Sequence, residues 1–311
     1  MRVSIVICTW NRAALLRETL SCFERLDVPP ALDWEVIVVD NNSSDNTSSV
    51  LDGFSSRLPL RRAFEAVPGK SRAANLAVRM ATGDLLLWTD DDVRVSAGWL
   101  RAYADAAVAH PDASWLGGPV EPWFASEPPT WIARNIASLW EPYALVDHGA
   151  SDGPLHQQAI VGANFGLRTA VAREFPFNER IGPTGHAALR GEETELLGRL
   201  RRAGLHGWWV GDARVKHYIS AERLTYKYIA HWYTGLGVGI ARSNGTFDGA
   251  RLFGYPRWAL RQYAWLQARV AAGSTRRDVA WVRNVRSAGI LRGYLAEARQ
   301  SPARQDSHER G

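Results

Sequence analysis

The feature that most constrains the fold is an alternation of short apolar runs with helical segments along the first 115 residues. Residues 3–8 and 34–39 are apolar without polar alternation, which is typical of strands buried on both faces of a parallel sheet. Further strands are expected at residues 60–66 and 84–89, and helices at residues 13–26, 71–81 and 96–110. The alternation predicts an α/β fold with a mostly parallel sheet and helices on both of its faces.

The alternation weakens after about residue 115. Residues 159–167 and 208–217 are expected to form strands, and residues 191–203 a helix whose acidic start and basic end suit the helix dipole. From residue 221 the sequence is aromatic and basic, with helical spacing at residues 258–271. We therefore expect two halves of an α/β domain at 1–115 and 116–220, a helical extension at 221–300 and a disordered tail at 301–311.

Composition limits the class of protein and its compartment. The chain has 311 residues, of which 46% are hydrophobic and 22% charged, and this composition excludes an intrinsically disordered chain. The two cysteines, Cys8 and Cys22, have neither metal-site nor disulfide spacing, which favours a reduced, cytoplasmic protein. No apolar stretch reaches the ~18–20 residues that span a bilayer, and the first residues predict no signal peptide.

The net charge of +5 is unevenly distributed along the chain. From Ala221 onward, 15 Arg and Lys residues stand against 6 Asp and Glu residues, a net charge of +9, which leaves −4 for the rest. The aromatic and basic residues 258–265 can pack on the body, lie on an anionic membrane surface or contact nucleic acid. Core packing is the default, and peripheral contact with the inner face of the plasma membrane comes next, because Trp, Tyr and Arg suit that interface. No nucleic acid is expected as a partner.

Polar side chains follow the predicted strands at their carboxyl ends. These side chains are Thr9, Asn11 and Arg12 after the first run, Asp40 after the second, and Asp90, Asp91 and Asp92 after the run at 84–89. In open α/β sheets, ligands bind beyond the carboxyl ends of the strands. The sequence therefore predicts a binding site at this edge of the sheet.

The acidic run at residues 90–92 is the clearest chemical signal. Three adjacent carboxylates repel one another unless a cation is present, and hard cations such as Mg²⁺ or Mn²⁺ take oxygen ligands that they share with substrate phosphates. A solvated acidic turn or a helix cap is the alternative. Asp40 can accept hydrogen bonds from a nucleobase or from ribose hydroxyls, and its alternative role is to cap the helix that follows.

Other candidates lie further along the chain. Lys70 and Arg72 stand at the start of a predicted helix, where cations oppose the dipole unless an anion binds there; a solvated loop is the alternative. Glu192 and Glu193 begin the helix at 191–203, either as ordinary acidic residues of a first turn or as a general base. His217 ends a predicted strand and is either structural or a ligand of metal or phosphate.

Several segments resemble the family 2 glycosyltransferases, which have the GT-A fold. The matching segments, in the family's order and spacing across about residues 1–220, are VSIVICTWNR, VIVVDNNSSDNT, GKSRAANLAVRMATGDLLLWTDDDV, GANFGLRTAV, GEETELLGRLRRAG and VKH. The resemblance implies a Rossmann-like nucleotide-sugar-binding half at 1–115 and an acceptor-binding half at 116–220. The Gln-x-x-Arg-Trp signature of processive synthases has no clear match, so the addition of single sugars is expected.

The resemblance also implies residue roles. The nucleotide-sugar contacts are expected to be Thr9, Asn11, Arg12, Asp40, Lys70, Arg72 and Asp90. The metal site for Mn²⁺ or Mg²⁺ is expected to include Asp91 as direct ligand, Asp92 as its acidic neighbour and His217 near the diphosphate. Glu193, with Glu192 beside it, is similar to the base of an inverting displacement. The expected substrates are a UDP-sugar and a glycan or lipid-linked acceptor.

Two rival functions remain open on the sequence. A sugar-1-phosphate nucleotidyltransferase shares the nucleotide-binding fold and metal aspartates, but it is expected to carry a glycine-rich loop with a basic residue after the first strand, which Thr9–Arg12 lacks. A non-catalytic nucleotide-sugar-binding module is the other rival, and the intact acidic set argues against it.

Overall fold

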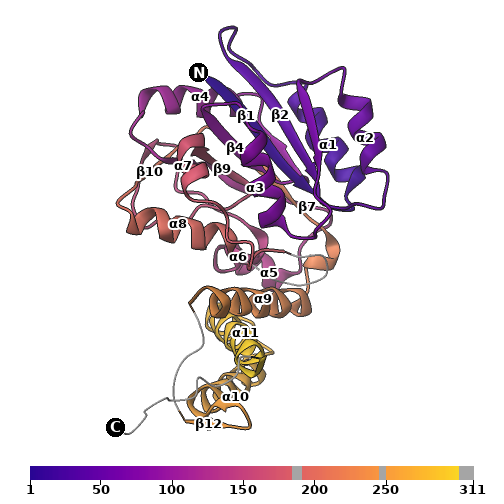
Figure 1. Cartoon of the computed structure of the whole chain (residues 1–311). Coiled ribbons are helices and arrows are strands. Elements are labelled where there is room, and N and C mark those ends of the chain that lie inside the picture. The colour runs from indigo at the N-terminus through magenta and orange to yellow at the C-terminus, as the bar shows by residue number, and fades with distance from the viewer. Residues whose placement is uncertain (184–190, 245–249, 301–311) are drawn as a thin grey trace, which may run out of the picture.

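A sheet of eight strands forms the centre of the N-terminal body, in the order β3-β2-β1-β4-β9-β6-β10-β8. The computed structural model describes residues 1–183, 191–244 and 250–300 (Figure 1), so the tail at 301–311 lies outside the described residues. The strands of this sheet are β1 Arg2–Thr9, β2 Asp33–Asp40, β3 Leu60–Phe64, β4 Leu85–Thr89, β6 Trp115–Gly117, β8 Gly153–Leu155, β9 Asn164–Arg168 and β10 Gly207–Trp209. β3, β2, β1 and β4 run parallel, and β9 is antiparallel to β4 and β6.

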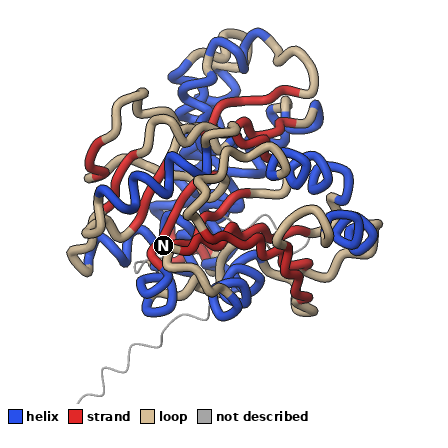
Figure 2. Tube along the Cα trace, turned by 90° about the horizontal axis from the view of Figure 1, so that it is seen from above, coloured by secondary structure: helices blue, strands red, loops and turns tan. Residues whose placement is uncertain are grey.

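The predicted α/β class is confirmed. β1 and β4 are buried almost throughout, because helices cover the sheet on both sides (Figure 2). The helices of the body are α1 Ala13–Phe23, α2 Thr47–Phe54, α3 Lys70–Met80, α4 Trp99–Ala109, α5 Thr130–Arg134, α6 Trp140–Tyr143, α7 Thr169–Glu174 and α8 Glu192–Arg202. The strand predicted at 159–167 begins only at Asn164.

A second, smaller sheet has its first strand a few residues after the carboxyl end of β4. It has the order β5-β11-β7, with β5 at Val93–Val95, β7 at Val120–Phe124 and β11 at Val215–Ile219. The prediction of one strand at 208–217 was therefore wrong, because β10 and β11 belong to different sheets. A turn at residues 210–214 separates them, closed by a hydrogen bond from the backbone N–H of Ala213 to the carbonyl of Val210. This turn redirects the chain so that β11 carries His217 to the predicted site.

The helical extension packs as a unit with its own hydrophobic core. It comprises α9 Tyr226–Asn244, a hairpin of β12 Arg251–Leu252 and β13 Tyr255–Pro256, α10 Arg257–Ala272 and α11 Val279–Gln300. Figure 1 shows α9 between the body and the other two helices. The core of the extension also takes in Ile132 and Leu139 from the segment before residue 220. A Cβ on Gly237 of α9 would lie 2.0 Å from the carbonyl oxygen of Ile290 of α11, so these two helices approach as closely as glycine permits.

One buried carboxylate ties three elements of the sheet together. Glu35 of β2 accepts hydrogen bonds from the Ser4 hydroxyl at 2.7 Å, from the backbone N–H and hydroxyl of Thr82 at 2.8 and 2.7 Å, and from Arg61 at 2.8 Å. Burial opposes the charge, but these donors outweigh it and hold the pKa of Glu35 at about 2, below its usual 4.5.

Replacing Glu35 with Gln is expected to lower the free energy of unfolding at pH 7 by up to about 3 kcal/mol. Because the folded-state pKa is depressed, this stabilisation is present above pH ~4.5 and is lost as the pH falls towards 2. Urea unfolding of both proteins at several pH values measures the difference. Asp33→Asn, an exposed position on the same strand, is the matched control, and equal stability of wild type and Glu35→Gln at pH 7 would contradict the assignment.

Candidate active site

A cavity of about 510 Å³ opens where the carboxyl ends of β1 and β4 meet α8, β11 and α9. Its position is the edge of the sheet at which the sequence predicts a site. The predicted site residues that line it are Thr9, Asn11, Arg12, Lys70, Asp90, Asp91, Asp92, Glu192, Glu193 and His217. These residues come from five elements between residues 9 and 217, and the fold brings them together around one space.

Two predicted contacts lie outside this lining. The carboxylate of Asp40 accepts a hydrogen bond from the backbone N–H of Ser43 at 2.9 Å, within the turn after β2. Arg72 forms an ion pair with Glu179 at 2.8 Å and is partly exposed. Their roles as nucleotide contacts stay predictions.

The loops after β1 and β2 hold each other in place. Asn11, with a left-handed φ of 53°, accepts a hydrogen bond from the backbone N–H of Ser44 at 2.7 Å. The backbone N–H of Asn11 donates to the hydroxyl of Ser43 at 2.9 Å. Asparagine tolerates this backbone conformation better than most residues do. The loop therefore presents Thr9 and Arg12 to the cavity from a fixed backbone.

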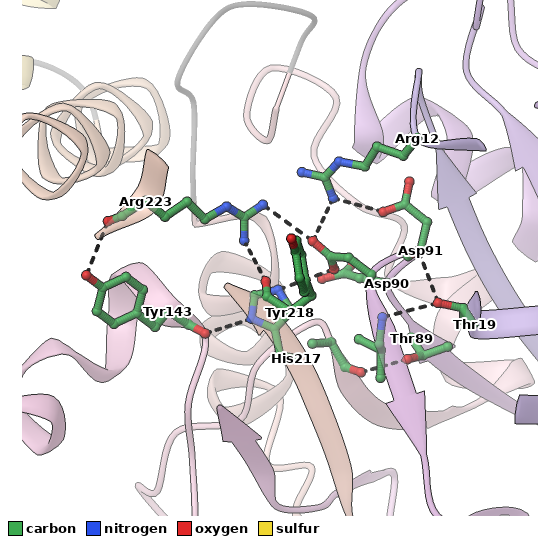
Figure 3. A network of polar contacts seen from close by, with 12 residues as sticks. Arg12, Thr19, Thr89, Asp90, Asp91, Tyr143, His217, Tyr218 and Arg223 are labelled. Carbon is green, nitrogen blue, oxygen red and sulfur yellow. Dashed lines mark hydrogen bonds and ion pairs between the residues drawn. The ribbon is translucent and has the colours of Figure 1, made fainter. Parts of the chain in front are cut away.

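Asp91 contacts two residues near the N-terminus of the chain. Its carboxylate accepts a hydrogen bond from Arg12 at 2.9 Å (Figure 3). It accepts another from the Thr9 hydroxyl at 2.8 Å. Arg12 also reaches Asp92 at 2.8 Å, and these carboxylates raise the pKa of Arg12 above its usual value. Burial raises the pKa of Asp91, and Arg12 opposes that rise. Both oxygens of Asp91 thus have protein donors.

Asp92 and His217 lie together deeper in the cavity. His217 donates from Nδ1–H to the carbonyl oxygen of Tyr143 at 2.8 Å (Figure 3). This leaves its Nε2 directed at Asp92 Oδ1, 3.3 Å away. Asp92 Oδ1 is buried and has no hydrogen-bond partner among the described residues. Burial opposes the charge of Asp92, but His217, Arg12 and Arg223 outweigh it, so its pKa lies far below the usual range.

This pair fits a divalent cation. Oxygen or nitrogen atoms of Asp90, Asp92 and His217 lie within 4.8 Å of one another. Metal-binding histidines usually donate their other ring N–H to a carbonyl or carboxylate, as His217 does to Tyr143. The geometry therefore groups Asp92 with His217, whereas Asp91, the direct ligand in the sequence prediction, is held by Thr9 and Arg12.

The net charge of the side chains that line the cavity also indicates a site for a divalent cation. The carboxylates are Asp90, Asp91, Asp92, Glu192 and Glu193, and the permanent cations are Arg12, Lys70 and Arg223. Glu141 also lines the cavity, but Arg286 neutralises it through two hydrogen bonds of 2.5 and 2.7 Å. The remaining excess of two negative charges equals the charge of one divalent cation, which would relieve the repulsion among them.

Lys70 connects the metal side of the cavity to α8. Its ammonium lies 3.0 Å from Asp90, 3.1 Å from Glu193 and 3.6 Å from Glu192. Burial disfavours the charge of Lys70, but these carboxylates outweigh it and raise its pKa well above the usual value. These three carboxylates balance the charge of Lys70 at the start of α3, where a cation would otherwise oppose the helix dipole.

Glu193 has the more accessible of the two glutamate side chains. Its side chain is 18% exposed, against 5% for Glu192. A Cβ at Gly162 would lie 1.8 Å from Glu193 Oε1, so only glycine there lets the carboxylate occupy its place in the cavity. This glycine lies in the segment GANFGLRTAV, whose contribution to the site the sequence reasoning did not recognise.

The opposite wall was also missed. Arg223 donates to Asp92 at 3.4 Å, and Trp140, Tyr228 and Trp232 add an aromatic surface from α6 and α9. The sequence signal for Arg223, Tyr228 and Trp232 was an aromatic and basic segment without a motif, which fits core packing equally well, and Trp140 lies outside that segment. Only the placement of α9 beside the body shows that some of them face the cavity.

Comparison with known proteins gives the family. The sequence profile described as "Glycosyl transferase family 2" matches residues 4–173. The chain is 27% identical over 201 residues to the succinoglycan biosynthesis protein ExoM of Rhizobium meliloti (strain 1021), covering 64% of this chain and 55% of ExoM. It is 37% identical over 102 residues to a validoxylamine A glucosyltransferase of Streptomyces hygroscopicus subsp. limoneus, covering 32% of this chain and 22% of that protein. The chain thus spans about half of the first relative and less of the second.

Solved structures support the GT-A fold. A mannosyltransferase from Pyrobaculum calidifontis, in complex with GDP-Man and Mn²⁺, has a TM-score of 0.59 at 20% identity, covering 95% of this chain and 85% of that one. S. aureus TarS 1-349 in complex with UDP-GlcNAc has a TM-score of 0.56 at 16% identity, covering 98% and 93%. Because the family profile covers more than half of the sequence, the chain belongs to family 2 of the glycosyl transferases.

Proposed function

We propose that this protein transfers a sugar from a nucleoside diphosphate sugar to a hydroxyl group of a glycan or lipid-linked saccharide. The observation that carries this proposal is one cavity that combines a possible Asp-Asp-His cation site, a buried lysine and an accessible carboxylate at the start of a helix. Family membership supports the same reaction class. A UDP-sugar is the proposed donor, because the TarS structure holds UDP-GlcNAc, while the GDP-Man of the mannosyltransferase makes a guanosine donor the second choice.

The donor is assigned to the side of the cavity formed by β1, β4 and α3. Thr9, Asn11 and Arg12 border the nucleotide, and Lys70 supplies a positive charge for the diphosphate. Asp90 pairs with Lys70 and belongs to the proposed cation site, and from there it can reach ribose or the donor sugar. Asp40 and Arg72 would act through the loops around them.

Asp92 and His217, with Asp90, would hold Mn²⁺ or Mg²⁺ in this arrangement. When bound, such a cation neutralises the charge that develops on the departing diphosphate. Asp91 then acts mainly by fixing Thr9 and Arg12 beside the donor. Arg223 contributes a further positive charge next to Asp92.

Glu193 is the proposed base of an inverting single displacement. It removes the proton from the acceptor hydroxyl as that oxygen bonds to the anomeric carbon. The bond between the anomeric carbon and the diphosphate oxygen breaks at the same time, and the nucleoside diphosphate leaves with the electron pair. Lys70, 3.1 Å away, positions the carboxylate at the N-terminus of α8.

The acceptor is assigned to the aromatic wall. Trp140, Tyr228 and Trp232 offer apolar faces in the cavity that Glu193 also lines, and binding sites for organic ligands commonly combine such faces with a few polar groups. The C–H faces of a saccharide ring suit this surface.

We place the reaction in the cytoplasm, which the free thiols of Cys8 and Cys22 support. None of the described helices is long and apolar enough to cross a bilayer.

A donor panel tests the proposal. UDP-glucose, UDP-GlcNAc, UDP-galactose, GDP-mannose and dTDP-glucose are each incubated with the protein and Mn²⁺, and release of nucleoside diphosphate is measured. We expect release from at least one donor and a loss of at least about tenfold on adding a chelator. Release of pyrophosphate from a nucleoside triphosphate and sugar 1-phosphate would instead favour the nucleotidyltransferase, and no turnover of any donor would favour a binding module.

A further inference from the structure

α10 and β12 lie at the end of the helical extension farthest from the sheet (Figure 1), and large aromatic side chains are exposed there. Phe253, at the tip of the β12–β13 hairpin, is 88% exposed, and Trp258 and Trp265 of α10 are 41% and 55% exposed. The opposite face of α10 carries Ala259 and Leu266, which are buried in the core of the extension. Trp258 also contacts the core residue Tyr294, with 6.4 Å between the ring centroids, whereas Phe253 and Trp265 are the more exposed of the three.

The backbone at Phe253 is unusual. Phe253 and Gly254 form the two-residue loop of the hairpin, with φ values of +52° and +84°. Such loops normally take Asn, Asp or Gly at the first position, because a bulky side chain is strained at positive φ. The chain thus holds a phenylalanine in solvent at a position where a small polar residue would fold more easily, and strain of this kind often marks a functional site.

Arginine accompanies the aromatics on the same surface. Trp258, Arg261, Trp265 and Arg269 follow one another at spacings of three and four residues, so they share one stripe of α10. The guanidinium of Arg269 lies 4.7 Å from the ring centroid of Trp265. Within residues 1–183, 191–244 and 250–300, no ion pair involves Arg257, Arg261 or Arg269.

The segment around this stripe is strongly basic. Residues 250–300 contain ten arginines and two acidic residues, Asp278 and Glu297, a net charge of +8. Glu297 is paired with Arg242 of α9 at 3.1 Å. α10 itself carries no acidic residue. The exposed aromatics therefore lie in a positive field, which attracts an anionic surface and opposes contact with a second copy of the same surface.

We propose that α10 and the β12–β13 hairpin dock the protein on an anionic lipid surface. Tryptophan and phenylalanine enter the boundary between headgroups and acyl chains, and arginines beside them pair with lipid phosphates. Single-stranded nucleic acid also stacks on aromatics between cations, but it binds in a positively charged groove that follows the strand. A lipid surface requires only one exposed face.

Docking through α10 would serve the proposed sugar transfer, and this part of the inference rests on the proposed function. α9 lines the cavity with Tyr228 and Trp232 and packs against α11 on its other side. α10 in turn packs against α11. Docking through α10 therefore leaves the cavity at the junction between the membrane-bound extension and the body, where a saccharide carried on a lipid can reach it.

Flotation of the full chain with vesicles tests the docking. The vesicles contain phosphatidylcholine with or without about 30% phosphatidylglycerol, at about 0.05 and 0.5 M salt. We expect binding to the anionic vesicles at low salt and at least tenfold less binding without phosphatidylglycerol. The triple variant Phe253→Ser, Trp258→Ser, Trp265→Ser and the triple variant Arg257→Gln, Arg261→Gln, Arg269→Gln should each lower binding at least tenfold.

Matched controls keep the result specific. Phe64→Ser removes a phenylalanine that is 59% exposed on β3, and Arg17→Gln with Arg202→Gln removes exposed charges from α1 and α8. Both controls should bind vesicles like the wild type. Absence of vesicle binding, or binding by either triple variant that equals that of the wild type, would overturn the proposal. Preference for single-stranded DNA over vesicles, or dimerisation that the triple variants abolish, would also overturn it. Hydrolysis of a soluble donor should be unchanged in the triple variants, so failure of docking is distinguishable from failure of the proposed reaction.

Discussion

Replacing Glu193 with Gln is expected to lower the rate of sugar transfer by about 10²–10⁴-fold, the usual contribution of a general base. The amide keeps the size of the side chain and still accepts a hydrogen bond from Lys70, but it cannot take the acceptor proton. Donor binding should therefore change little. Steady-state transfer assays, combined with titration of the donor, separate these two effects.

The neighbours of Glu193 supply the controls. Glu195→Gln lies on the same helix and removes a carboxylate that pairs with Arg199 at 2.9 Å, away from the cavity, so it should retain activity. Glu192→Gln should lower activity less than Glu193→Gln does, because the Glu192 side chain is more deeply buried. A Glu193→Gln enzyme with nearly full activity, or a larger loss in Glu192→Gln, would contradict the assignment of the base.

Replacing His217 with Ala or Asp92 with Asn is expected to weaken the activating affinity for Mn²⁺ at least about tenfold. His217 is held by Tyr143 and directed at Asp92 Oδ1, so each variant removes one donor atom from the proposed cation site. The measurement is the Mn²⁺ concentration that gives half-maximal donor hydrolysis. Asp105→Asn, an exposed position on α4, is the control and should behave like wild type.

Asp91→Asn distinguishes the two assignments of the aspartates. The structure has Asp91 bound to Thr9 and Arg12, so this variant should weaken donor binding more than Mn²⁺ activation. If Asp91→Asn instead gave the largest shift in Mn²⁺ activation, and Asp92→Asn little, Asp91 would be the direct ligand that the family resemblance implies.

Much of the fold follows from local sequence physics. β1, β2 and β4 are apolar runs too short for helices, and each ends in polar residues that cannot continue a buried strand. The edge of the sheet at which Thr9 and Asp90 meet was therefore predictable. The family resemblance added roles to these residues, and ten of the twelve predicted site residues line the cavity.

The rest depends on contacts between distant segments. Residues 208–217 look like one strand because the hydrophobic pattern does not show the turn at 210–214 that sends β10 and β11 to different sheets. Arg223, Tyr228 and Trp232 reach the cavity only because α9 packs beside the body. Lys70 is set among Asp90, Glu192 and Glu193 by three elements, a grouping that no local pattern encodes.

The most direct test of the account is a calorimetric titration of the protein with UDP, GDP and dTDP, each with Mn²⁺ and with a chelator. We expect that at least one nucleotide, UDP in the first place, binds in the presence of Mn²⁺, and that its affinity falls at least about tenfold with the chelator or in His217→Ala. Binding of none of the three nucleotides, or an affinity that is the same with and without the metal and in the variant, would contradict a metal-dependent nucleotide-sugar site in this cavity.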